Sequence, residues 1–340
     1  MGSGQTREKV IAGASDCTGQ LPAWTENAVL VYGPRKGGTT LFQNLLDGSD
    51  GLFAYPAELK LKFFISHDFG SQRNDDAKRY RSWSRIRSVS SARLSQDTYT
   101  KLWNSADPAL SLKDLIRQDV SIVFESVTPR PPTPKLWCAK DVGGKTDRIL
   151  KLWFDTFPES RVLFILRDPL MVTRAILNDR RRRGVRLKIR RIAREMLDAF
   201  RVVKAQTNYL EDPRILAIAY EDLVVDTRAV MRRVADFLRL PYSEHFERPS
   251  ILGDAVVVST SSRKTKNVFA EGAKWSHGLT LRERAVVTVV RVLTSLMPSY
   301  GLDYPAIRQR LGTLSRDQND RVVRNGRKSS MANRDDPTNL

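Results

Sequence analysis

The chain has 340 residues, of which 41% are hydrophobic, enough to build a core in one large domain or two small ones. Its 57 Lys and Arg residues against 38 Asp and Glu residues give a formal net charge of +19, which argues for anionic partners such as phosphate cofactors, acidic glycans, nucleic acid or anionic lipid. No apolar run is long enough to span a bilayer, the N-terminus lacks a secretory pattern, and two cysteines are too few for a disulfide framework, so we expect a cytoplasmic protein.

Residues 1–25 are polar and mixed, and we expect them to form a flexible arm ahead of the folded part of the chain. The segment 29–46, VLVYGPRKGGTTLFQNLL, then predicts a buried strand, a glycine-rich turn and a helix. A turn of this kind points backbone N–H groups at an anion, and the positive end of the helix dipole faces the same point. The segment therefore favours a phosphate-bearing ligand, the alternative being a turn with no ligand.

The turn differs in one respect from the phosphate loop of NTPases. Gly33 and Gly38 have the spacing of that loop, but Thr39 stands where its lysine is expected. The lysine lies inside the turn, at Lys36, next to Arg35. The glycine-rich turn that can bind an anion is present, but its lysine stands at another position, which weakens the case for ATP with magnesium.

A carboxylate follows the turn at a short distance in sequence. Tyr55-Pro56 predicts an extended start for this segment, and Glu58 comes two residues later. A general base must lie within hydrogen-bond reach of the proton it removes, and Glu58 is a candidate for that role. The alternative is a surface ion pair of Glu58 with Lys60 or Lys62.

The middle of the chain is less regular. Residues 67–107 are polar and rich in Ser and Arg, and we expect short helices and loops there that carry substrate contacts. Residues 110–118 predict a helix and residues 120–124 a strand. A further short apolar run, 136–140, ends at Lys140.

The most strand-like segment, RVLFIL at 161–166, ends at Arg167-Asp168-Pro169. Ligands of open α/β sheets gather at the carboxyl ends of the strands. An arginine at that position can bind a phosphate with both arms of its planar guanidinium. Arg167 is therefore a candidate phosphate ligand, the alternative being a salt bridge with Asp168.

A basic stretch follows at 180–194, beginning with four consecutive arginines. Within 189–203 the apolar residues fall on one helical face, and Arg190, Arg191 and Arg194 lie largely on the other. Charge runs usually face water, which predicts a solvated basic helix. The alternative is a docking surface for an anionic acceptor.

The last third predicts three further elements. Residues 215–219 predict a strand that leads into Tyr220-Glu221-Asp222-Leu223, and Asp226 is placed to cap the next helix. A capping box at 280–283 predicts a helix to about residue 297. Residues 306–340 are polar, and we expect a disordered tail there. His and Cys are too sparse to form a metal-ligand spacing.

Several of these segments occur together in one order: GPRKGGTTLFQNLLDG, YPAEL, CAKD, VLFILRDP, YEDLVVDTRAVMRRVADFLRLP and AKWSHGLT. From about residue 28 to residue 297 the chain resembles the sulfotransferase superfamily, whose members use 3′-phosphoadenosine 5′-phosphosulfate (PAPS). The resemblance implies an α/β fold class, with a single P-loop-like domain at 26–305 and a central parallel sheet flanked by helices.

The resemblance also implies a set of cofactor contacts. The turn is similar to the loop that binds the 5′-phosphosulfate, through Arg35, Lys36, Gly37, Gly38, Thr39 and Thr40. Arg167 corresponds to the family arginine on the 3′-phosphate. Ser259, or else Ser261 or Ser262, resembles a serine that assists the phosphosulfate, and Trp275 resembles the tryptophan of the family's lysine–tryptophan pair.

Three catalytic assignments follow from the same resemblance. Lys36, in a Lys-Gly-Gly-Thr loop similar to that of glycosaminoglycan sulfotransferases, would steady the bridging oxygen during transfer. Glu58 falls within one or two places of the glutamate that serves as base in the tyrosylprotein branch. Lys140 resembles a second active-site lysine of that branch.

One position departs from the family pattern. The serine usually found eight residues after the RDP arginine is replaced by Ala175. Thr173 and Asn178 are the neighbouring groups that could substitute for its hydroxyl, and Arg174 could supply charge instead. The departure bears on the affinity for the cofactor more than on the fold.

The expected function is transfer of a sulfuryl group from PAPS to a hydroxyl or amine, without a metal and with 3′-phosphoadenosine 5′-phosphate (PAP) as product. The acceptor is expected to be a hydroxyl compound such as a carbohydrate, with an anionic glycan compatible with the basic surface. Two alternatives are a P-loop kinase for a small molecule and a non-catalytic protein that binds anions or nucleic acid. A P-loop kinase would need a lysine after Gly38, where this sequence has Thr39, and no recognition motif for specific nucleic acid is present.

Overall fold

The computed structural model describes residues 21–65, 86, 89, 91–106, 111–185, 187–256, 258–259, 264–265, 276–297 and 300–312. The flexible arm expected at 1–25 lies outside these ranges up to residue 20, but Trp24 and Thr25 are buried in the short helical turn η1 (Ala23–Glu26). The polar tail expected at 306–340 lies outside them beyond residue 312.

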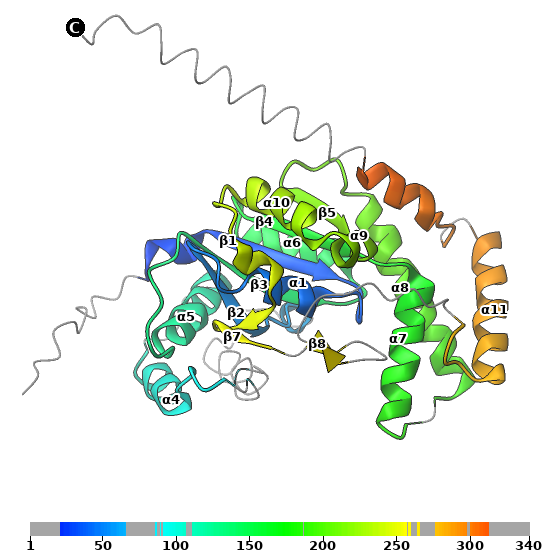
Figure 1. Ribbon diagram of the computed structural model, residues 1–340, viewed down its shortest axis with the longest axis horizontal. Coiled ribbons are helices and arrows are strands. Elements are labelled where there is room, and N and C mark those ends of the chain that lie inside the picture. The colour runs from blue at the N-terminus through cyan, green and yellow to red at the C-terminus, as the bar shows by residue number, and fades with distance from the viewer. Residues whose placement is uncertain are drawn as a thin grey trace, which may run out of the picture.

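A five-stranded sheet forms the centre of the fold, in the order β2-β3-β1-β4-β5 (Figure 1). Its strands are β1 (Ala28–Gly33), β2 (Leu52–Glu58), β3 (Leu136–Val142), β4 (Arg161–Leu166) and β5 (Ile215–Ala219). Every neighbouring pair is parallel, and Leu30 of β1 pairs with Ala139 of β3 on one side and Val162 of β4 on the other. All carboxyl ends therefore lie at one edge, with the turn after β1 between those after β3 and β4. The predicted fold class is confirmed.

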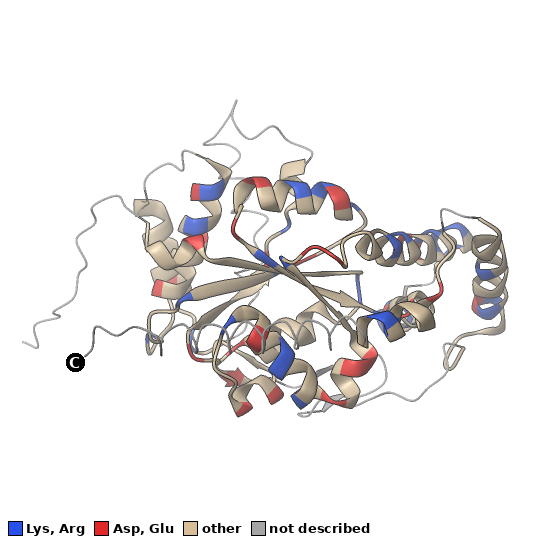
Figure 2. Ribbon diagram, turned by 90° about the horizontal axis from the view of Figure 1, so that it is seen from above, with Lys and Arg blue, Asp and Glu red and all other residues tan. Residues whose placement is uncertain are grey.

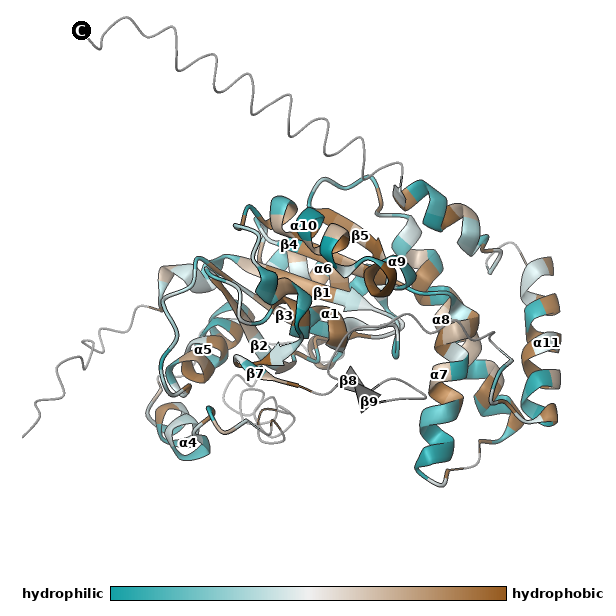
Figure 3. Ribbon diagram, viewed as in Figure 1, coloured by the Kyte–Doolittle hydropathy of each residue, from teal (hydrophilic) through white to brown (hydrophobic). Residues whose placement is uncertain are grey.

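The two faces of the sheet bury alternate residues of each strand. One face packs against α5 (Leu112–Glu125), α6 (Thr146–Thr156) and α8 (Ile189–Thr207), and the other against α1 (Thr39–Leu46) and α10 (Thr227–Leu238). On β1, for example, Leu30 and Tyr32 face the first group of helices, and Val29 and Val31 face the second. Figure 3 shows hydrophobic strands between helices that carry hydrophilic residues on their outer sides. Burial on both faces explains why these strands appear as apolar runs without alternation.

Local capping sets the starts of several helices. Asp168 caps α7 (Pro169–Arg182) by accepting the N–H of Leu170 at 2.8 Å, with proline at the first helical position. Asp226 caps α10 by accepting the N–H of Ala229 at 2.9 Å, as predicted. The predicted capping box of α11 (Leu281–Leu296) is also confirmed, with Thr280 and Glu283 bonded reciprocally.

The strand predicted at 120–124 is wrong, because these residues belong to the second half of α5. Ser111 starts that helix by accepting the N–H of Asp114, and Leu115, Ile116, Val120 and Val123 then bury one helical face. A short apolar run fits a buried helix as well as a buried strand, so periodicity alone could not separate the two.

The remaining elements are small or peripheral. They are η1 (Ala23–Glu26), α2 (Lys62–Ile65), α4 (Gln96–Ser105), α9 (Tyr220–Val225), η3 (Glu244–Glu247) and the two-residue strands β6 (Ser250–Ile251), β7 (Asp254–Ala255), β8 (Val258–Ser259) and β9 (Lys264–Thr265). A last helix, 304–312, extends past the boundary expected at residue 305, and its Tyr304 and Leu311 are buried. None of the helices described here is long and apolar enough to cross a membrane.

Helices α7, α8 and α11 form one end of the molecule, on the right in Figures 1 and 2. Arg190, Arg191 and Arg194 are exposed on α8, and buried Ile192 and Met196 hold its other face. The basic helix is therefore solvated, as predicted, although Ile189 at its start is 48% exposed rather than buried.

Candidate active site

The turn between β1 and α1 is tightly constrained at its glycines. Gly38 has a φ of 110°, and a Cβ there would lie 2.4 Å from the ring of Tyr220. A Cβ on Gly33 would lie 2.5 Å from the carbonyl oxygen of Ile165 on β4. Gly37 closes the turn by donating its N–H to the carbonyl of Pro34 at 2.8 Å. Gly38 caps α1 without a side chain, so no side-chain acceptor caps the first-turn N–H groups of that helix.

Arg167, at the carboxyl end of β4, is bound to the backbone of this turn. Its Nη1 donates to the carbonyl oxygen of Lys36 at 2.8 Å, and its guanidinium carbon lies 4.1 Å from the ring centre of Tyr220. The residue is only 8% exposed, yet its Nε has no hydrogen-bond partner among the described residues. A buried donor without a partner is costly, so this arrangement fits an anionic ligand that would complete it.

Lys36 lies in the turn with a φ of 61° and directs its ammonium towards α7. Its Nζ is 3.1 Å from Oδ1 of Asp179. Burial alone would raise the pKa of Asp179, but the hydrogen bond and charge of Lys36, together with Arg183 and Arg182, outweigh it and lower that pKa. Asp179 is therefore an anion at neutral pH and pairs with the lysine in this structure.

The other two predicted catalytic residues lie on the opposite side of the turn, towards β3 and β2. Lys140 donates to the hydroxyl of Thr40 at 2.8 Å, which links the end of β3 to the first turn of α1. Glu58 is half-buried, and its backbone lies opposite that of Lys140 in the pairing of β2 with β3. The structure thus brings Glu58, Lys140 and Thr40 together beside the turn.

Asp141, the residue after Lys140, is fully buried. Burial first, and then the charge of Glu58, raise its pKa to about 7, although it accepts backbone N–H groups from Val142 and Leu61. Sequence reasoning did not select this carboxyl.

The raised pKa of Asp141 predicts a pH-dependent cost to stability. In the folded protein Asp141 keeps its proton up to about pH 7, whereas in the unfolded chain it loses it near its ordinary pKa of 3.8, so its contribution to stability falls as pH rises between these values. We expect Asp141→Asn, which cannot ionise, to gain about 4 kcal/mol relative to the parent between pH 4 and pH 8. Urea unfolding of both proteins across this range measures the difference. A difference in the free energy of unfolding that stays constant at all pH values would contradict the raised pKa of Asp141.

Several residues predicted for the cofactor site contact groups away from the turn or lie outside the described ranges. Thr173 is fully buried and donates its hydroxyl to the carbonyl of Pro169, within α7. Ala175 is buried, and Arg174 donates to the carbonyl of His277 at 3.0 Å. The backbone of Ser259 lies in β8. Ser261, Ser262 and Trp275 lie outside the described residues, so their roles stay predictions.

A family model for the sulfotransferase family matches residues 28–244. The chain belongs to the sulfotransferase family. The matched range contains the turn, Glu58, Lys140, Arg167 and α9, so the resemblance seen in the sequence motifs is confirmed over residues 28–244 and the protein is a sulfotransferase. No curated protein sequence matches the chain.

Several solved structures are similar to this sulfotransferase at low identity. A sulfotransferase domain from the curacin biosynthetic pathway is 19% identical over 78% of this chain and 97% of that chain, with a TM-score of 0.41. A sulfotransferase domain from the Synechococcus PCC 7002 olefin synthase is 19% identical over 78% and 94%, with a TM-score of 0.44. Retinol dehydratase in a complex with retinol and PAP is 16% identical over 84% and 85%, with a TM-score of 0.41.

Sequence reasoning missed the groups that hold the predicted site residues in place. Asp179 gave no signal, because it lies in a charged run where an ion pair with a distant lysine cannot be read. Tyr220 and Glu221 were visible as part of a signature, but their contacts with Arg167 and Asp168 depend on the packing of β5 beside β4. Across the described ranges, no group of three or more His, Cys, Asp or Glu residues could hold a metal ion.

Proposed function

We propose that this sulfotransferase moves the sulfuryl group of PAPS to a hydroxyl or amine of its acceptor at the turn between β1 and α1. The observation that carries this proposal is Arg167, which is buried, bound to the Lys36 carbonyl and left with an Nε that has no hydrogen-bond partner in the described part of the chain. A guanidinium in this state binds a phosphate with charge-assisted hydrogen bonds. Arg167 would hold the 3′-phosphate, and the N–H groups of the turn would hold the 5′-phosphosulfate.

PAPS would supply an activated sulfuryl group on a phosphate leaving group. Lys36 would stabilise the negative charge that develops on the leaving oxygen, with the first-turn N–H groups of α1 beside it. Glu58 would remove the proton of the acceptor, and Lys140, which is bonded to Thr40, would add positive charge on the same side. Arg35, Thr39 and Thr40 complete the turn. The roles expected from the family for Trp275 and for Ser259, or else Ser261 or Ser262, remain predictions, as does Thr173 as a substitute for the serine that Ala175 replaces.

Lys36 would have to exchange its partner during this reaction. Its ammonium lies 3.1 Å from Asp179, on the side of the turn that faces α7. An incoming phosphosulfate brings about two negative charges into the turn itself, against one on Asp179, so the lysine would rotate towards it. Asp179 would remain neutralised by Arg182 and Arg183, both of which form ion pairs with it.

The acceptor that we favour is a carbohydrate. The Lys-Gly-Gly-Thr loop resembles that of glycan-modifying members of the family, and the exposed arginines of α7 and α8 would suit an anionic glycan. The cytoplasmic location expected from the two cysteines stays a prediction.

Calorimetry with PAP tests the donor assignment. We expect PAP to bind with a dissociation constant of about 1–10 μM, unchanged by EDTA, and ATP with magnesium to bind at least about tenfold more weakly. Tighter binding of ATP with magnesium would support a kinase instead. Salt-sensitive binding of oligonucleotides without binding of PAP would support a non-catalytic anion-binding protein.

A further inference from the structure

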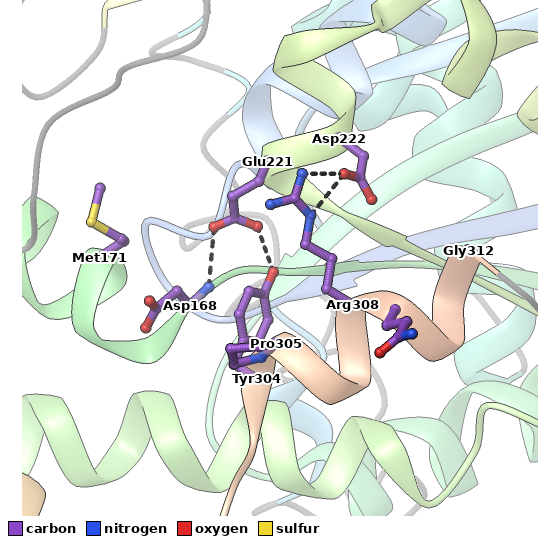
Figure 4. A pocket seen from close by; sticks show the side chains of 9 residues that line it. Asp168, Met171, Glu221, Asp222, Tyr304, Pro305, Arg308 and Gly312 are labelled. Carbon is purple, nitrogen blue, oxygen red and sulfur yellow. Dashed lines mark hydrogen bonds and ion pairs between the residues drawn. The ribbon is translucent and has the colours of Figure 1, made fainter.

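Helix 304–312 is connected to the turn that carries Arg167 through one carboxylate. Glu221, in the first turn of α9, accepts the hydroxyl of Tyr304 at 2.5 Å and the backbone N–H of Asp168 at 3.3 Å (Figure 4). Tyr304 is only 8% exposed, so the first of these bonds is largely shielded from water. Glu221 therefore joins the C-terminal helix to the residue that directly follows Arg167.

The same turn of α9 also supports the Arg167 side chain. Tyr220 precedes Glu221, and its ring lies 4.1 Å from the Arg167 guanidinium carbon. The ring is also packed closely against Gly38, because a Cβ there would lie 2.4 Å from it. A displacement of Glu221 would consequently move both the ring against Arg167 and the backbone at Asp168.

A second contact fixes this turn of α9 to the same helix. Arg308 binds Asp222 through its Nε at 2.8 Å and its Nη2 at 2.5 Å. Residues 304 and 308 are one helical turn apart and lie on one face, so consecutive acidic residues of α9 contact consecutive turns of helix 304–312. These residues line a pocket of about 620 Å³ that also contains Met171. None of the turn residues 33–40 lines this pocket, so it is distinct from the proposed phosphosulfate site.

Electrostatics gives Tyr304 a further effect on an anion at Arg167. An unscreened Glu221 carboxylate beside the Arg167 turn would oppose binding of a phosphate there. The Tyr304 hydroxyl and the Asp168 N–H each donate to this carboxylate and so reduce its effective charge. Burial raises the pKa of Tyr304, and the charges of Glu221 and Asp168 raise it further, so Tyr304 stays protonated and remains a donor.

We propose that Tyr304 is a positioning residue for recognition of the 3′-phosphate: through Glu221 it holds Tyr220 and the Asp168 backbone so that Arg167 meets that phosphate. This inference rests on the proposed function, in which Arg167 binds the 3′-phosphate of the nucleotide. Helix 304–312 then contributes to nucleotide recognition, although its side chains act through the acidic residues of α9 and not by touching the nucleotide. A merely structural role would be limited to holding the helix on the domain.

Two nucleotides that differ only in the 3′-phosphate separate these roles. Tyr304→Phe keeps the ring and removes the hydroxyl, and we expect the dissociation constant of PAP to rise about tenfold while that of adenosine 5′-phosphate changes less than about twofold. Tyr300→Phe is the matched control, because Tyr300 lies in the same segment but bonds Arg201. Calorimetry on the full chain measures both constants, and thermal unfolding monitors the fold.

Arg167→Ala provides the reference for this experiment. It should remove the preference for PAP over adenosine 5′-phosphate, and Tyr304→Phe should have no further effect on PAP binding in that background. The role of Tyr304 would be overturned if Tyr304→Phe weakened the binding of both nucleotides equally or weakened neither. It would also be overturned if Tyr304→Phe had its full effect on PAP binding in the Arg167→Ala background. If instead the parent protein shows no preference for PAP, or Arg167→Ala keeps it, the proposed function fails and this inference fails with it.

A second variant covers the case in which Tyr304→Phe folds poorly. Arg308→Gln breaks the contact with Asp222 at an exposed position and leaves Tyr304 in place. We expect a selective loss of PAP affinity of about threefold. An equal loss for both nucleotides, or none, would overturn the proposal.

Discussion

Lys36→Ala is expected to lower the turnover number of the sulfotransferase by about 10²–10³-fold, because in the proposed mechanism this lysine stabilises the charge that develops on the leaving oxygen. The dissociation constant of PAP should change by less than about tenfold, since the N–H groups of the turn and Arg167 remain. A coupled assay of sulfuryl transfer, with calorimetry of PAP, measures the two effects separately.

The structure indicates that this substitution can be made without disturbing the fold. Lys36 has a φ of 61°, and alanine carries the same Cβ as lysine, so the backbone strain at this position is unchanged. Asp179 loses the lysine but keeps its ion pairs with Arg182 and Arg183, so no unpaired buried charge is left. Lys151→Ala, on the exposed side of α6, is the control. Unchanged turnover in Lys36→Ala would remove the lysine from the mechanism.

The turn and its neighbours could be predicted from sequence because their chemistry is local. Gly33 and Gly38 are separated by the spacing of an anion-binding turn, and Lys36 lies between them. Arg167 follows a buried strand directly, and parallel pairing of β4 with β1 brings it to the same edge as the turn. Strand order and carboxyl-end geometry are general properties of α/β sheets, so the position of Arg167 followed from its place in the chain.

The groups that orient these residues could not be predicted in the same way. Lys36 with Asp179, and Glu221 with Tyr304, are contacts between segments far apart in sequence. They depend on how α7 and helix 304–312 pack, which no local pattern specifies. The error at 120–124 has the related cause that an apolar run takes its secondary structure from its surroundings.

Asp179 and Glu58 are two described carboxylates near the turn, and their surroundings differ. Asp179 is held by Lys36 and two arginines, and these cations outweigh the effect of burial and lower its pKa. A carboxylate of lowered pKa is a weak proton acceptor. Glu58 lies on the other side of the turn, beside Lys140 and near the buried Asp141. The acceptor should therefore approach from the side of β2 and β3.

Glu58→Gln is expected to reduce sulfuryl transfer by about 10²–10⁴-fold, because glutamine has nearly the same shape but cannot take the acceptor proton. The affinity for PAP should be unchanged, and this would separate Glu58 from Lys36 and Arg167, which contact the nucleotide in the proposed mechanism. Glu244→Gln, far from the turn in sequence, is the control for loss of a carboxylate. Because the charge of Glu58 helps to raise the pKa of Asp141, the variant should also bring that pKa down from about 7, which NMR titration of the carboxyl carbon would detect. A lowered Asp141 pKa with full activity would place Glu58 beside Asp141 but exclude it as the base, whereas loss of activity with unaltered PAP binding would assign the proton transfer to it.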